Sequence, residues 1–222
     1  PLAGTVAILL AGRWPNLREA MSVVAGIALF LVVVEIAVLI DAGEPVALAL
    51  ATPFPGLPLA LEVEPLGLLF ALIASGLWIV TTIYATGYMR AHHEGNQTRV
   101  YAFFSIAIAS AMGIAFAGNM LTLFVFYEVL TVSTFPLVTH AGTAEARRAG
   151  RVYLGILLST SIGLQLVAIV GTYVVAGTLD FRQGGILAGK ASPLMLGALL
   201  ALYMFRIGKA ALMPFHRWLP AA

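Results

Sequence analysis

Four ionisable side chains lie within strongly apolar stretches of this sequence: Glu35, Glu128, Arg206 and Lys209. A charge at the centre of a bilayer costs about 2.5 to 3.5 kcal/mol on insertion scales, so each needs a structural or functional reason. Carboxylates and amines both bind and release protons. The chemistry that these residue types allow is therefore reversible proton transfer inside an apolar environment.

Glu128 is close to the middle of the apolar stretch 120–140. Thr131 lies on the same side at helical spacing, and Pro136 removes a backbone donor, which leaves the carbonyl group of Val132 free for water or a side chain. The pattern predicts a hydrated stripe along one helix. His140, at the end of the stretch, is either an interfacial histidine or a proton relay.

Lys209 lies five residues before Pro214, which leaves the carbonyl group of Ala210 without its usual helical partner. A broken or kinked helix beside a buried lysine is how transporters line an ion site. Four residues would share one face if helical geometry continued through the proline: Arg206, Lys209, Met213 and His216.

Each candidate also has a structural interpretation. Glu128 or Lys209 could form an ion pair that joins two helices, and Arg206 could do the same. Glu35 is nearer the end of its stretch and could reach the membrane surface. For Gln165, an inter-helix hydrogen bond is expected.

The composition indicates that these helices lie in a membrane. Of 222 residues, 61% are hydrophobic and 10% charged, and the mean hydropathy is +0.99, which a water-soluble domain of this size could not accommodate. The absence of cysteine excludes disulfides, thiol nucleophiles and cysteine-ligated clusters. A net charge of +2 gives no reason to expect a nucleic-acid partner. We expect an all-α, multi-pass transmembrane bundle without cofactor or metal, and no catalysis by this chain alone.

A helix that crosses a bilayer needs about 20 apolar residues, and this length divides the chain into seven predicted spans within one membrane domain. The expected spans are 2–12, 20–40, 65–88, 101–117, 120–140, 152–176 and 194–213. Eight basic residues fall on one side and two on the other, which predicts an N-terminus outside. Alternating residues and prolines indicate that the outer loop 41–64 could form a small hairpin. Both chain ends look truncated.

Two motifs resemble the antiporter-like membrane subunits of Mrp antiporters and respiratory complex I. Phe126-Tyr127-Glu128, followed by the basic residues Arg147, Arg148 and Arg151, resembles their glutamate helix and the loop after it. The run from Gly208-Lys209 through Pro214 to Trp218-Leu219-Pro220 resembles their seventh-helix signature. The chain then corresponds to the N-terminal half of such a subunit.

This resemblance implies about fourteen helices with two inverted five-helix repeats, of which this chain would be cut within the first. It implies proton conduction through Glu128 on the fifth helix and Lys209 on a broken seventh helix. From the residues themselves, and not from the resemblance, we expect supporting positions at Thr131, Pro136, His140, Arg206, Pro214 and His216. Arg206 matches no element of the family pattern.

The function expected from the resemblance is proton conduction within a multi-subunit cation/proton antiporter of the Mrp type in a bacterial inner membrane. Its partners would be other membrane subunits, the lipid bilayer, protons, and Na⁺ or K⁺. One alternative is a proton-pumping subunit of a complex I, membrane-bound hydrogenase or inorganic-carbon uptake complex. Another is a structural anchor that transports nothing.

Overall fold

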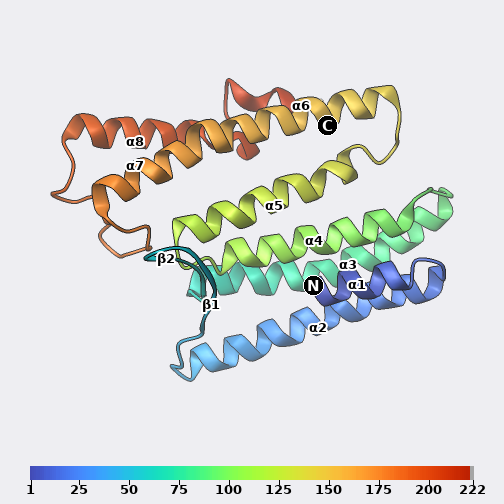
Figure 1. The fold of residues 1–222 in the computed structure, drawn as a ribbon. Helices are drawn as coiled ribbons and strands as arrows, with labels where there is room; N and C mark the ends of the chain where they lie inside the picture. Colours follow the sequence, from blue (N-terminus) through green and yellow to red (C-terminus); the bar gives the residue numbers. More distant parts are fainter. Residues whose placement is uncertain (221–222) are drawn as a thin grey trace. The chain divides into compact units, whose positions relative to one another are not determined.

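The computed structural model describes residues 1–220, and these are mostly helical (Figure 1). Five helices are long and apolar enough to cross a membrane. They are α2 (Pro15–Asp41), α3 (Pro65–Ala91), α4 (Gln97–Ala115), α5 (Met120–Val138) and one long helix, Ala144–Ala176. The chain is therefore a multi-pass membrane protein.

Two further helices are shorter than a bilayer span. Helix α1 (Leu2–Leu10) has 9 residues and α8 (Pro193–Phe205) has 13. The seven spans and the outward N-terminus expected from the sequence are not confirmed. Helix α8 ends well before residue 213, and two 3₁₀ turns follow it, η2 (Gly208–Ala210) and η3 (Phe215–Trp218).

The helix starts follow local sequence signals. Helices α2, α3 and α8 each begin with a proline, whose missing N–H group costs nothing in the first turn. Three other side chains accept a hydrogen bond from the first turn of their own helix. These capping residues are Asn119 for α5, Thr143 for α6 and Ser192 for α8.

The chain forms two compact units. Unit 1 comprises Pro1–Leu48 and Glu62–Phe116, and so contains helices α1 to α4. Within it α2 packs along α3, and α1 packs against both α2 and α4. Ile8, Tyr101 and Ala102 form a buried cluster where α1 meets α4. Gly26 permits α2 to approach Ile79 of α3, since a Cβ atom there would lie 3.2 Å from the Ile79 side chain.

Unit 2 contains Ala49–Leu61 and the chain from Ala117 onward. Its longest element is a continuous rod of α6 (Ala144–Thr160), η1 (Ser161–Leu166) and α7 (Val167–Ala176), with α8 lying beside α7 (Figure 1). The η1 segment is π-helical, a form found mostly as single turns inside α-helices and frequently at functional sites. Ser161 and Gln165 of this segment are buried.

A two-stranded hairpin interrupts the helices in the loop 41–64. Strands β1 (Ala47–Phe54) and β2 (Leu57–Glu62) are joined by a turn in which Gly56 has a φ of 77°. The hairpin contacts the start of α5. The Asn119 side-chain amide donates to the Pro58 carbonyl at 2.8 Å, and the Ala60 N–H group donates to Thr122 Oγ1 at 3.0 Å.

Candidate proton-transfer site

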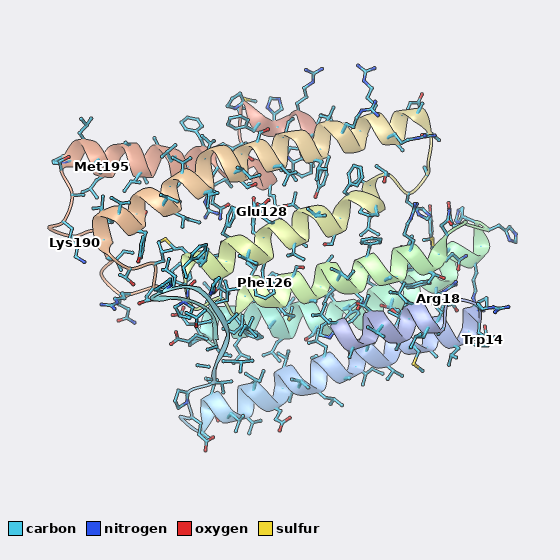
Figure 2. All side chains as sticks on the ribbon, in the orientation of Figure 1. Trp14, Arg18, Phe126, Glu128, Lys190 and Met195 are labelled. Carbon is cyan, nitrogen blue, oxygen red and sulfur yellow. The ribbon has the colours of Figure 1, made fainter. Side chains whose placement is uncertain are left out.

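Glu128 projects from α5 into unit 2 (Figure 2). Its side chain is half-buried, and Oε1 is buried without a hydrogen-bond partner among residues 1–220. Ser161, at the first position of η1, interacts with the same carboxyl group. The carboxylate thus retains an unused acceptor oxygen next to an irregular turn of the neighbouring helix.

Lys209 lies in the η2 turn that follows α8, where it is half-buried. Its Nζ atom donates to the carbonyl oxygen of Tyr127 at 3.1 Å and lies 3.7 Å from the centroid of the Tyr127 ring. Tyr127 immediately precedes Glu128, so the ammonium and carboxyl groups interact electrostatically. No direct ion pair joins them in the described part of the chain.

The Tyr127 carbonyl oxygen accepts hydrogen bonds from two side chains. Besides Lys209, it accepts a hydrogen bond from Thr131 Oγ1 at 2.9 Å, and Thr131 is fully buried. Pro136 lies inside α5, in the same helix as these groups. Thr131 therefore contacts the same backbone oxygen that holds the ammonium group.

A second set of contacts holds the segment after α8. Trp218 Nε1 donates to the Gly208 carbonyl oxygen at 2.6 Å, and its ring packs edge-to-face on Tyr153 at 5.5 Å between centroids. The Tyr153 hydroxyl group is hydrogen-bonded to Thr134 Oγ1 at 2.5 Å. Gly208 approaches Thr160 so closely that a Cβ atom would lie 2.5 Å from Thr160 Oγ1. These contacts position Lys209 against α5 and α6.

The helical face that the sequence permits after Arg206 does not form. Helix α8 ends at Phe205, and Ala211 adopts a left-handed backbone conformation that no continuous helix allows. Met213, Pro214 and His216 are exposed in this irregular segment, whereas Lys209 is directed toward Tyr127. A face shared by Arg206, Lys209, Met213 and His216 is therefore ruled out.

The remaining predicted residues lie apart from this pair or contact it less directly. Glu35 is exposed on α2 in unit 1, and His140 follows the end of α5. Arg206 is half-buried with its guanidinium carbon 5.7 Å from the Tyr203 ring centroid, and its Nε atom has no hydrogen-bond partner within the described chain. Gln165 Oε1 is likewise unpartnered there, so this oxygen does not form the expected inter-helix hydrogen bond.

Sequence reasoning missed several polar groups. The role of Tyr127 depends on a backbone carbonyl group and a ring face, which carry no pattern in the sequence. Glu19 was overlooked because hydropathy starts the span after it, whereas α2 begins at Pro15. In unit 1, Glu19 is buried and forms ion pairs with both Arg18 and Arg90. These residues lie at the N-terminal end of α2, where Arg18 is labelled in Figure 2.

The described residues contain no group of three or more His, Cys, Asp or Glu side chains that could hold a metal ion. The buried and half-buried polar groups described in unit 2 include instead an amine, a guanidinium, a carboxylate, amides and hydroxyls. This set can bind and pass protons, but it has too few anionic oxygens to coordinate a divalent metal.

Comparison with known proteins now identifies the fold. Residues 117–222 match the transmembrane model of the NADH:quinone oxidoreductase/Mrp antiporter family. The resemblance to antiporter-like membrane subunits is thereby confirmed. The matched region includes Glu128, Lys209 and the irregular segment after α8.

Two curated relatives extend the similarity into unit 1. Hydrogenase-4 component B of Escherichia coli is 31% identical over 185 residues, covering 82% of this chain and 27% of that protein. The putative antiporter subunit mnhA2 of Staphylococcus aureus is 30% identical over 168 residues, covering 73% and 20%. This chain therefore spans about a quarter of the length of these relatives.

Two solved structures share the fold. A chain of the membrane-bound sulfane sulfur reductase, an archaeal respiratory membrane complex, superposes with a TM-score of 0.83 at 22% identity, over 100% of this chain and 45% of that one. A chain of the Mrp complex from Dietzia sp. DQ12-45-1b gives 0.71 at 24% identity, over 99% and 24%. Both belong to multi-subunit membrane complexes.

Proposed function

We propose that this chain is the proton-conducting part of an antiporter-type membrane subunit, and that Glu128 and Lys209 transfer the protons. The observation that carries the proposal is the position of the Lys209 ammonium group. It lies in a helix break, half-buried, and is held by the residue that precedes Glu128.

The geometry suggests two arrangements of the lysine. In the observed arrangement its charge is stabilised by the Tyr127 carbonyl group and ring, and Glu128 keeps a free acceptor oxygen. Movement of the ammonium group to Glu128 would form a direct ion pair. Because opposite charges stabilise each other's ionised form, making the pair retains the lysine proton and breaking it favours proton release.

Water supplies the connection between these groups. No direct ion pair joins Lys209 and Glu128 in the described chain, and a proton-transfer group can act through an intervening water molecule. The π-helical turn places Ser161 beside Glu128 and gives that water a further hydroxyl partner.

The relatives' names favour two assemblies. Similarity to an antiporter subunit supports an Mrp-type cation/proton antiporter, which would exchange protons for Na⁺ or K⁺. Similarity to a hydrogenase component supports a proton-pumping subunit of a redox-driven complex. Both place the chain among other membrane subunits, and the bacterial relatives favour a bacterial inner membrane.

The test uses the full-length protein in its native complex. E128Q and K209M are compared with wild type by the pH gradient formed in inverted membrane vesicles, after assembly is verified. Each should lower proton transport by about a hundredfold or more, the scale on which removal of a proton-transfer group acts. E35Q is the matched control, since Glu35 is an exposed carboxylate in another apolar helix.

Wild-type transport by assembled E128Q and K209M would refute the proposal and support a structural anchor. Replacing Na⁺ by K⁺ or by choline in the same vesicles tells an antiporter from a redox-driven pump. An antiporter requires an alkali cation on the opposite side, whereas a redox-driven pump requires only its electron donor.

A further inference from the structure

A small cavity in unit 2 is separate from the contact between Lys209 and Tyr127. It has a volume of about 210 Å³ and is lined by α5, η1, α7 and α8 and by Phe181 of the loop before α8. Figure 1 shows α7 and α8 side by side in this part of the molecule. The lining residues are Met120, Leu123, Gln165, Ile169, Phe181, Tyr203 and Arg206.

Two residues that line this cavity, Gln165 and Arg206, each carry a buried polar atom without a protein partner among the described residues. Gln165 is 1% exposed and its Oε1 atom accepts no hydrogen bond from residues 1–220. The Nε–H group of Arg206 is buried and donates to no acceptor in the same range. Buried polar groups are nearly always hydrogen-bonded, and a cavity that is both polar and roomy is where ordered water supplies the missing bonds.

Tyr203, a third polar side chain of the lining, already has hydrogen-bond partners. The Tyr203 hydroxyl group is hydrogen-bonded to Thr172 Oγ1 at 3.0 Å and to Met120 Sδ at 3.3 Å. Water is therefore needed at Gln165 and Arg206. Water can supply both kinds of bond, because it donates to an amide oxygen and accepts from an N–H group.

The charge of the lining is positive. Arg206 is its one charged residue, and the nearest carboxylate along the chain, Asp180, already forms an ion pair with Arg182 at 3.6 Å. An alkali cation entering the cavity would meet a like charge and few oxygen ligands to replace its hydration shell. Water meets neither obstacle.

We propose that this cavity is a water-filled vestibule and that Arg206 is its specificity-determining residue, which admits water and repels cations. The inference rests on the proposed function in one respect: Arg206 lies three residues before Lys209, so the vestibule would bring water toward the proton-transfer pair while keeping Na⁺ and K⁺ away from it. Arg206 acts here as a fixed charge and does not itself exchange protons.

The test uses the absence of cysteine from residues 1–222. In a cysteine-free version of the full-length protein in its complex, I169C places a thiol in the vestibule. V170C is the matched control, because Ile169 is 3% exposed and lines the cavity whereas Val170 is 54% exposed on the outer side of the same helix. L123C is a second reporter from α5 if I169C does not assemble.

The measurement is the reaction rate with a small anionic methanethiosulfonate reagent and with its cationic analogue. I169C should react faster than V170C, because thiolates form only where water is present. The anionic reagent should be favoured by about tenfold, since a fixed charge in a low-dielectric cleft concentrates ions of opposite sign. R206Q should bring the ratio close to that of free thiol, and R206K should keep it.

Equal reaction of I169C and V170C, with L123C also unreactive, would overturn the vestibule. A rate ratio unchanged by R206Q would overturn the role of Arg206. Neither rate requires transport. Normal transport by E128Q and K209M would therefore refute the proposed function while leaving these rates as they are.

Discussion

The ammonium group of Lys209 is held by Tyr127 twice, through the backbone carbonyl oxygen at 3.1 Å and through the ring face at 3.7 Å. The two contacts come from one residue of a different helix, so a shift of the segment after α8 loses both together. The position of the lysine is thereby tied to a single point on α5.

Replacing Tyr127 separates these two contacts. Y127F keeps the ring and the carbonyl group, so we expect proton transport and stability close to wild type. Y127L keeps only the carbonyl group and should lose a cation–π contact of about 0.5 to 2 kcal/mol. Vesicle proton transport and the thermal midpoint of the purified complex measure the difference. Equal losses in both variants would show that the hydroxyl group matters and the ring face does not.

The close approach of Gly208 to Thr160 makes a steric prediction. G208A should destabilise the protein by about 1 to 3 kcal/mol, the usual cost of overpacking, because the added Cβ atom lies 2.5 Å from Thr160 Oγ1. The second change T160A removes that oxygen and should restore part of the loss. G155A is the control, since a Cβ atom at Gly155 meets nothing within 4 Å. Thermal unfolding in detergent measures all three variants, and a stable G208A would contradict the packing.

The hydrogen bond from Trp218 to the Gly208 carbonyl group joins the beginning and the end of the segment after α8. W218F keeps an aromatic ring against Tyr153 but loses the N–H donor. We expect faster amide hydrogen exchange in residues 206–218, because local openings are limited by such contacts. W14F, at an exposed tryptophan, should leave that exchange unchanged. Identical exchange in W218F and wild type would show that the bond does not restrain the segment.

The buried carboxylate of Glu19 makes a prediction for unit 1. E19A leaves the buried guanidinium of Arg18 without its counter-ion, and removal of one partner from a buried pair typically costs about 3 to 5 kcal/mol. R90A should cost less, because buried Glu19 keeps its ion pair with Arg18 and the Arg90 side chain is itself 49% exposed. A cycle of E19A, R90A and the double variant, followed by thermal unfolding, measures the coupling. A larger loss in R90A than in E19A would reverse this order.

Much of the fold can be predicted from hydropathy, because a long apolar stretch indicates a helix that lies in the membrane. Glu128 and Lys209 stood out for the same reason, as charges in apolar surroundings. Hydropathy does not predict that Arg18 and Glu19 belong to α2. A charged pair lowers the local hydropathy even when its two members neutralise each other inside a helix bundle. Hydropathy also does not predict the end of α8 at Phe205, because apolar residues continue beyond it although the helix does not.

The π-helical segment could not be predicted for a different reason. Ser161 to Leu166 have the composition of an ordinary membrane helix, and the segment packs against α5 and α8, which no local sequence pattern reports. Likewise, the unpartnered atoms of Gln165 and Arg206 become visible only when two distant parts of the chain line one cavity.

The hairpin has a consequence for how this protein can be divided. It precedes α3 in the sequence, yet it bonds to Gly118, Asn119 and Thr122 at the start of α5. A truncation that begins at residue 117, where the family match begins, would leave these groups without their backbone partners. Unit 2 is therefore discontinuous in the sequence, and a fragment that keeps these hydrogen bonds needs residues 49–61 supplied by a linker or in trans.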